Sequence, residues 1–188
     1  MPVRSSLPVQ MDPIEFSQLL GILYGLLPRR CLEWGSGGST QAVLAHCPFI
    51  KQYVSIEHDP VWYQRVRDAV PDPRLALHLV QPDRPLPPGR HSREESIAWA
   101  AAAEQDPSVM ASYVSFPSTL TPGYDFILVD GRARRFCLLE AGRLLRPGAV
   151  LVLHDAQRTQ YHDALRSLGE PVFFEPWKRG QLCLLRLA

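Results

Sequence analysis

Short apolar runs alternate along the chain with segments of helical spacing. Tyr124–Asp130 (YDFILVD) is the most continuous run, as is typical of a strand buried on both faces of a sheet. The other runs predict strands at Cys31–Gly35, Gln52–His58, Arg74–Val80, Ala149–Leu153, Val172–Phe174 and Gln181–Leu187. The segments with helical spacing predict helices at Pro13–Leu27, Thr40–Cys47, Pro60–Ala69, Arg93–Gln105, Ala133–Leu145 and Tyr161–Leu168.

This alternation predicts an α/β fold. We expect a Rossmann-like, doubly wound sheet of seven mostly parallel strands with helices on both faces. The short connection Glu175–Gly180 predicts a hairpin, which makes the last strand antiparallel. A chain of 188 residues fits one domain, here residues 1–188, with 1–30 as an N-terminal lead-in and helix.

Residues 82–123 break the alternation. The segment is longer than ordinary connections between a strand and a helix, so it is predicted to be an insertion. It leaves a predicted strand at the edge where ligands bind. A substrate lid, with His91 and Arg93 as contacts, and an insertion without function are both open interpretations.

Composition narrows the classes of partner. A net charge of +1 argues against broad binding to nucleic acid or to a membrane surface. The sequence has no signal-peptide pattern and no apolar run of about 18 residues, so we expect no membrane span and a cytoplasmic location. The cysteines lie far apart with no CxxC pair, which predicts buried free thiols, most clearly at Cys31, Cys137 and Cys183.

The stretch CLEWGSGGST at residues 31–40 joins a predicted strand to a predicted helix through a turn rich in glycine. Gly35, Gly37 and Gly38 permit a sharp bend and close approach to a ligand. Glu33 stands at the end of the strand, where its carboxylate faces a polar ligand. An ordinary strand-to-helix turn has the same pattern, so neighbouring motifs are needed to distinguish a cofactor site from such a turn.

Carboxylates recur where the predicted strands end. They are Glu33, Glu57, Asp83, Asp130 and Asp155. In an open α/β sheet, ligands bind beyond the carboxyl ends of the strands. Polar residues at the solvent edge explain one or two such positions but not all five, so the pattern indicates a ligand site.

Glu57 lies about twenty residues after the glycine turn, where an acidic side chain binds ribose hydroxyls. Thr40 stands where the dinucleotide fingerprint requires glycine, and Glu33 would repel a pyrophosphate. A ligand that is cationic and rich in donors fits better, and S-adenosylmethionine is one. A nicotinamide-dependent oxidoreductase and a non-catalytic nucleoside-binding protein remain alternatives.

Four segments resemble, in order, the motifs of class I S-adenosylmethionine-dependent methyltransferases. They are EWGSGGS at 33–39, SIEHD at 55–59, YDFILVDG at 124–131 and RLLRPGAVLVLHD at 143–155. The resemblance implies that Glu33, Gly35 and Gly37 line the methionine moiety, that Glu57 holds the ribose and that Trp62 covers the adenine. Ser36, Gly38, Ser39, His58 and Asp130 complete the cofactor site that it implies, and Asp83 falls at the adenine-contacting segment.

VDG and LHDA are also similar to segments of metal-dependent O-methyltransferases for sugars and small molecules, such as the macrocin O-methyltransferase group. This resemblance implies that Asp130 and Asp155 bind Mg²⁺. His154 stands where such sites often carry a carboxylate. We therefore expect Asp130, His154 and Asp155 to be catalytic, either around a metal or without one and with His154 as general base. A histidine satisfied in the core is the third interpretation.

Three arginines follow Asp130 directly. Arg132 and Arg134 are candidates for binding an anionic acceptor such as a sugar acid or phosphate, because positive charge is otherwise unfavourable where a helix begins. Arg158 and Tyr161 are predicted to join the same pocket. The predicted function is methyl transfer from S-adenosylmethionine to an oxygen of a small molecule or sugar, with nitrogen as the less favoured acceptor atom.

Overall fold

The computed structural model describes residues 6–87 and 89–187. Its strands are β1 (Arg30–Trp34), β2 (Gln52–Glu57), β3 (Leu75–Leu79), β4 (Tyr124–Val129), β5 (Leu145–Leu153), β6 (Val172–Phe173) and β7 (Cys183–Arg186). Its α-helices are α1 (Pro13–Leu26), α2 (Gly38–His46), α3 (Pro60–Ala69), α4 (Arg93–Gln105), α5 (Ala111–Ser115), α6 (Arg134–Leu144) and α7 (His162–Leu168). Short 3-10 turns lie at Pro107–Val109, Phe116–Thr119 and Thr159–Tyr161.

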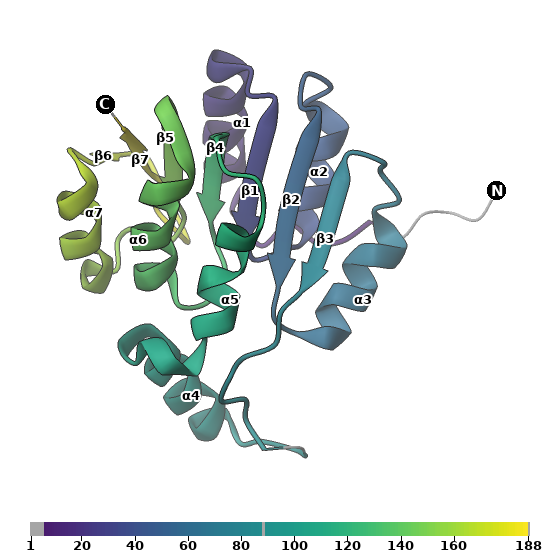
Figure 1. The fold of residues 1–188 in the computed structure, drawn as a ribbon, viewed down its shortest axis with the longest axis vertical. Coiled ribbons are helices and arrows are strands. Elements are labelled where there is room, and N and C mark those ends of the chain that lie inside the picture. The colour runs from purple at the N-terminus through teal and green to yellow at the C-terminus, as the bar shows by residue number, and fades with distance from the viewer. Residues whose placement is uncertain (1–5, 88, 188) are drawn as a thin grey trace.

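All seven strands form one sheet in the order β3-β2-β1-β4-β5-β7-β6. The first five strands in this order, β3 to β5, are parallel to one another. Strand β7 runs antiparallel to both β5 and β6. The predicted seven-stranded, mostly parallel sheet with a reversed last strand is therefore confirmed. Strand order reverses between β1 and β4, which lie side by side in Figure 1. This reversal is where an open α/β sheet binds ligands.

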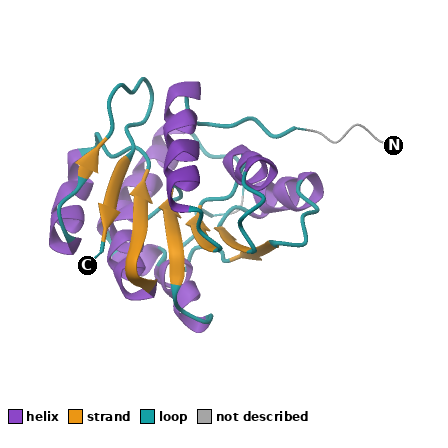
Figure 2. Cartoon of the chain, turned by 90° about the horizontal axis from the view of Figure 1, so that it is seen from above, coloured by secondary structure: helices purple, strands orange, loops and turns teal. Residues whose placement is uncertain are grey.

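Helices cover both faces of the sheet (Figure 2). One buried cluster packs α1, α2 and α3 against one face, and a second packs α4 to α7 against the other. Successive residues of β1 alternate between them, since Cys31 belongs to the first cluster and Leu32 to the second. The four cysteines, which include Cys47, are buried and free, as expected for three of them.

The start of α1 follows the chemistry of its sequence. The Asp12 side chain accepts a hydrogen bond from the amide of Ile14, and Pro13 occupies the first helical position. The Glu15 side chain accepts the amide of Asp12 in return, so the pair forms a capping box. Leu27 ends the helix in the left-handed conformation. The predicted helix is thus confirmed, and its first turn becomes important for the site.

The segment 82–123 forms the crossover from β3 to β4. Its helix α4 has the predicted bounds, and Ala103, Met110 and Tyr113 are buried in the core on the α6 face. Part of this segment therefore supplies the layer of helices over β1 and β2. Whether it also closes over a substrate stays a prediction. Among residues 6–87 and 89–187, no helix is long and apolar enough to cross a membrane.

One predicted boundary is wrong by four residues. The strand expected at Ala149 begins at Leu145, which pairs with Tyr124 on β4. The pairing then shifts, so that Phe126 faces Val150 and an irregularity interrupts the strand. A proline and a glycine therefore lie inside β5, where they were expected to separate a helix from a strand.

Candidate functional site

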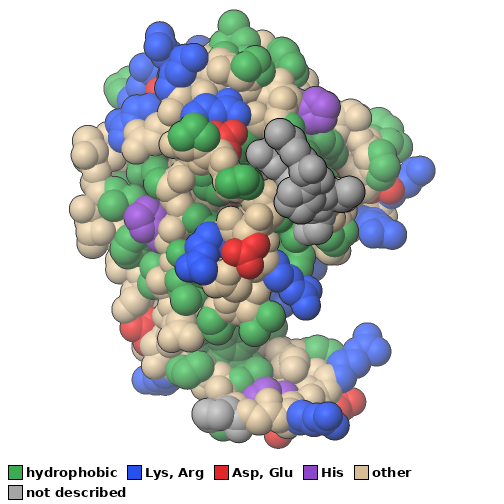
Figure 3. Space-filling view, turned by 90° about the vertical axis from the view of Figure 1, so that its right-hand side faces the viewer, with side chains coloured by type: hydrophobic (Ala, Val, Ile, Leu, Met, Phe, Trp, Pro, Cys, Tyr) green, Lys and Arg blue, Asp and Glu red, His purple; other side chains and the backbone are tan. Residues whose placement is uncertain are grey.

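A cavity of about 480 Å³ opens at the carboxyl ends of the central strands. This volume lies within the range of small-molecule sites. In the space-filling view, the segment between β3 and β4 projects from the lower end of the body, with a recess between the two (Figure 3). The cavity is lined by Gln10, Gly35, Ser36, Gly37, Gly38, Ser39, Glu57, His58, Asp59, Trp62, Asp130, Gly131, Arg132, Arg134, His154, Asp155 and Arg179. No described residue of the segment 82–123 is among them.

The glycine turn is held against the end of β4. Gly35 has φ 95°, and a Cβ on it would lie 2.6 Å from the Cα of Gly131. Only glycine tolerates both the conformation and the contact. The amide of Gly37 donates to Thr40 Oγ1 at 2.8 Å, so the threonine that breaks the dinucleotide fingerprint closes this turn.

Glu33 lies beneath the cavity rather than in it. Its side chain is fully buried and accepts hydrogen bonds from Tyr53, Ser55 and Thr40. Burial raises the pKa of this carboxyl to about 7, against the effect of these three hydroxyl donors. Glu33 therefore does not line the cavity, because the alternation along β1 turns its side chain toward α2, and its predicted contact with the methionine moiety stays a prediction. Glu33 supports the turn through Thr40.

Glu57, at the end of β2, binds the backbone of the glycine turn. Its carboxylate accepts the amide of Ser36 at 3.1 Å and the amides of His58 and Asp59 at 2.8 and 2.9 Å. Trp62 Nε1 donates to the Ser36 carbonyl at 2.6 Å, so the indole lies over the turn. The residues expected at the cofactor site therefore meet at one cavity, except for Glu33 and Asp83.

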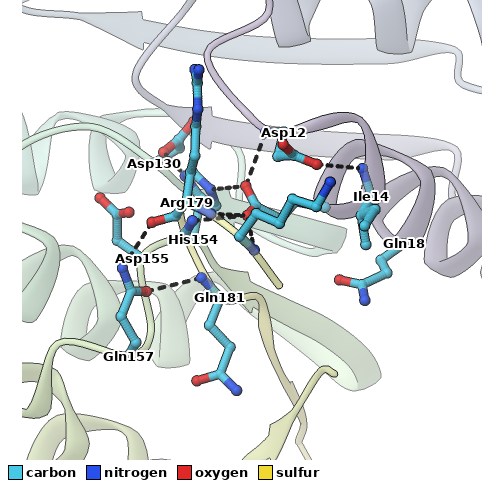
Figure 4. A network of polar contacts seen from close by, with 12 residues as sticks. Asp12, Ile14, Gln18, Asp130, His154, Asp155, Gln157, Arg179 and Gln181 are labelled. Carbon is cyan, nitrogen blue, oxygen red and sulfur yellow. Dashed lines mark hydrogen bonds and ion pairs between the residues drawn. The ribbon is translucent and has the colours of Figure 1, made fainter. Parts of the chain in front are cut away.

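His154, at the end of β5, lies between two carboxylates (Figure 4). Its Nδ1 is 2.8 Å from Asp130 Oδ1, and its Nε2 is 3.3 Å from Glu15 Oε2. Burial disfavours the charged ring, but the hydrogen bond and charge of Asp130, with the charge of Asp155, raise the pKa of His154. Because both ring nitrogens face acceptors, the arrangement favours the imidazolium, which has no lone pair for a general base.

Glu15 lies behind the cavity, in contact with His154, and was not predicted from the sequence. Gln10 and Arg179, which line the cavity, were not predicted either. The side chain of Glu15 is 0% exposed, and its Oε1 accepts the amides of Lys178, Arg179 and Gly180 at 3.0, 2.6 and 2.9 Å. Burial opposes ionisation, but these donors and the amide of Asp12 lower its pKa to about 2. The capping-box spacing was a visible signal for its helical role. Nothing in the sequence linked it to His154.

Arg134 joins the two aspartates predicted to bind metal. Its Nη1 lies 2.8 Å from Asp155 Oδ2, and its Nη2 lies 3.3 Å from Asp130 Oδ1. The same guanidinium donates to the backbone carbonyls of Gly131, Asp130 and His154. Burial opposes its charge, yet the two carboxylates raise its pKa. Arg134 is thus committed to the framework of the site and is not free to bind an acceptor.

The donor set does not fit Mg²⁺. A protein site for this ion uses oxygen ligands that are not already neutralised. Asp130 and Asp155 share a buried guanidinium, and the neighbouring ligand is an imidazole held by hydrogen bonds. In the described part of the chain, no three His, Cys, Asp or Glu side chains are grouped to hold a metal.

Several predicted contacts lie outside the cavity. Tyr161 is fully buried in the core and does not line the cavity, so its predicted contact with substrate stays a prediction without support from the geometry. Arg158 pairs with Asp155 at 2.8 Å beside the cavity. Asp83 accepts hydrogen bonds from the amide and hydroxyl of Ser112 and thereby fixes the start of α5. His91 and Arg93, at the start of α4, do not line the cavity.

The fold resembles solved methyltransferases over nearly the whole chain. A methyltransferase-like protein from Silicibacter pomeroyi is 21% identical, with a TM-score of 0.62 over 97% of this chain and 90% of that one. An O-methyltransferase from Bacillus cereus, in complex with SAH, is 13% identical, with a TM-score of 0.63 over 97% and 84%. An amino pentose methyltransferase from Micromonospora echinaspora, bound to SAM, is 14% identical, with a TM-score of 0.58 over 93% and 91%.

A scan of protein-family models finds no match, and neither does a search of curated proteins. At identities of 10–21%, the solved structures establish the architecture and not the activity. The chain therefore has the Rossmann-like fold of the class I S-adenosylmethionine-dependent methyltransferases.

Proposed function

We propose that the protein is an S-adenosylmethionine-dependent methyltransferase that methylates an oxygen of a small molecule. The observation that carries this proposal is the joint placement of the glycine turn, Glu57 and Asp130 around one cavity at the reversal of strand order. The solved structures that share the fold and contain SAM or SAH support the choice of cofactor.

The residues present fit this cofactor. A carboxylate such as Glu57 is an acceptor for the two ribose hydroxyls. A Cβ on Gly37 would face the ring of Trp62 at 3.7 Å, so the glycine leaves room between the indole and the turn. Gly35 and Asp130 also line the cavity, and the methionine moiety is expected beside them.

When bound, S-adenosylmethionine supplies a methyl group on a positively charged sulfur. The role of the chain is then to position the acceptor and to remove its proton. We assign the removal of this proton to Asp155 Oδ1, because both arginine partners of this side chain, Arg134 and Arg158, pair with its Oδ2. Asp155 lines the cavity in a left-handed backbone conformation (φ 63°) that is uncommon outside glycine. His154 is assigned a fixed charge beside Asp130 rather than the role of base.

Calorimetric titration with SAH and with NAD tests the proposal. We expect SAH to bind with a dissociation constant on the order of micromolar and NAD not to bind. Glu57→Ala should weaken SAH at least about tenfold, because buried hydrogen bonds to a carboxylate contribute roughly 1.5–3 kcal/mol. The matched control is Glu94→Ala, which removes an exposed carboxylate of α4. Binding of NAD instead of SAH would favour the oxidoreductase alternative.

A further inference from the structure

Two arginines line the cavity without a carboxylate partner. Arg132 follows β4, and Arg179 lies in the connection between β6 and β7. Both side chains are exposed, and neither forms an ion pair with any residue of 6–87 or 89–187. An unpaired guanidinium bordering a cavity is available for a ligand.

The nearest carboxylates of the cavity already have cationic partners. Asp155 pairs with both Arg134 and Arg158 at 2.8 Å, and Asp130 pairs with Arg134 at 3.3 Å. Glu57 accepts three backbone amides and is assigned above to the ribose. No ion pair within the described part of the chain therefore holds either of the two arginines, although the charge of Arg132 opposes the rise in the pKa of the half-buried Glu104 that burial causes.

The backbone that carries Arg179 is fixed. Its amide donates to Glu15 Oε1 at 2.6 Å, and its carbonyl accepts from Gln157 Nε2 at 3.1 Å. Figure 4 shows its long side chain extended from this loop. Because the loop is held on both sides, the guanidinium is presented to the cavity from a rigid support.

In sequence, both arginines lie close to residues that border Asp130 or Asp155. Arg132 is two residues from Asp130, and a Cβ on Gly180, next to Arg179, would lie 2.6 Å from Asp155 Oδ1. Asp155 is the residue assigned above to the acceptor, and both arginines line the same cavity. A guanidinium donates two parallel hydrogen bonds to a carboxylate or a phosphate, so a pair of them selects for such a group.

We propose that Arg132 and Arg179 together bind an anionic group of the methyl acceptor, a carboxylate or a phosphate. The proposal rests on the proposed function, because it takes the part of the cavity beside Asp155 as the acceptor subsite. Anchoring the anion there brings a hydroxyl of the same molecule near Asp155. The acceptor class is then a small hydroxy acid or a phosphorylated hydroxy compound.

The test uses the full chain saturated with SAH and three probes of similar size: 4-hydroxybenzoate, phenyl phosphate and uncharged 4-hydroxybenzamide. We expect the anionic probes to bind and the amide not to, and the tighter anion identifies carboxylate or phosphate chemistry. Arg132→Ala and Arg179→Ala should each weaken the preferred anion about tenfold or more. Arg135→Ala, an exposed arginine of α6 outside the cavity, should leave its affinity unchanged.

Equal binding of the amide, or undiminished anion binding by both variants, would overturn the proposal. SAH affinity is measured first, in each variant, to separate the two claims. A loss of SAH affinity in either variant would assign that arginine to the carboxylate of the cofactor and would also overturn the proposal. Failure of the unmodified chain to bind SAH would contradict the proposed function instead.

Discussion

Glu15 Oε2 lies 3.3 Å from His154 Nε2, although 139 positions separate the two residues in the sequence. The other oxygen of the same carboxylate holds three consecutive amides of the connection before β7. One buried side chain therefore ties the first turn of α1 to the end of β5 and to the last hairpin. Helix α1 is a part of the site and not only a layer over the sheet.

Replacing Glu15 by Ala should destabilise the fold by about 3 kcal/mol, because several buried donors lose a charged acceptor. Urea denaturation measures the loss, and Glu94→Ala serves as the exposed control. The pKa of Glu15 is lowered to about 2, so its stabilisation is complete above its ordinary pKa of 4.5 and is lost as pH falls toward 2. A difference between the wild type and Glu15→Gln that did not shrink in this range would contradict the assignment.

Arg134→Met should cost roughly 3–5 kcal/mol, since it leaves Asp130 and Asp155 without their shared buried cation. Arg135→Met, the next residue and an exposed one, should change the stability by less than about 0.5 kcal/mol. Paired thermal and urea melts compare the two. Equal effects would mean that the bridge contributes nothing specific.

Glu33 gives the protein a pH dependence of unusual sign. Its pKa is raised from 4.5 to about 7, so the folded state retains a proton that the unfolded state releases. The contribution of Glu33 to the free energy of unfolding is therefore greatest below pH 4.5. It falls by on the order of 3 kcal/mol as the pH rises to 7 and is constant above that pH. Glu33→Gln should remove this slope. Parallel pH profiles for wild type and variant would contradict the prediction.

Gly180→Ala should disrupt the part of the cavity beside Asp155. A Cβ at this position would lie 2.3 Å from His154 Nε2 and 2.6 Å from Asp155 Oδ1, so the imidazole or the loop must move. We expect a destabilisation of about 1–3 kcal/mol and an altered nuclear magnetic resonance signal for the His154 ring. Gly148→Ala tests a glycine with open space around it, where only the positive φ of 76° is strained. An unchanged His154 signal in Gly180→Ala would contradict the packing described.

Local chemistry made most of the fold predictable. Asp12 and Pro13 marked the start of α1, and the apolar run at Tyr124 marked the central strand β4. The carboxylates at strand ends pointed correctly to the edge of the sheet, because parallel strands deliver their carboxyl ends to one side. The glycine turn, Glu57 and Asp130 meet there as expected.

Side-chain direction and long-range contacts were not predictable. Glu33 was expected in the cavity, but its place in the alternation of β1 buries it against Tyr53 and Thr40. Tyr161 lies in a turn whose packing depends on α6, which the sequence of the turn does not encode. Glu15 joined the site through a tertiary contact that no local pattern contains.

The most direct measurement is a crystal structure of the full chain with SAH. We predict that the ribose hydroxyls lie within hydrogen-bonding distance of the Glu57 carboxylate. We also predict that the sulfur lies between the turn at Gly35 and the side chain of Asp155. SAH bound outside this cavity, or bound within it without a contact between Glu57 and the ribose, would contradict the account.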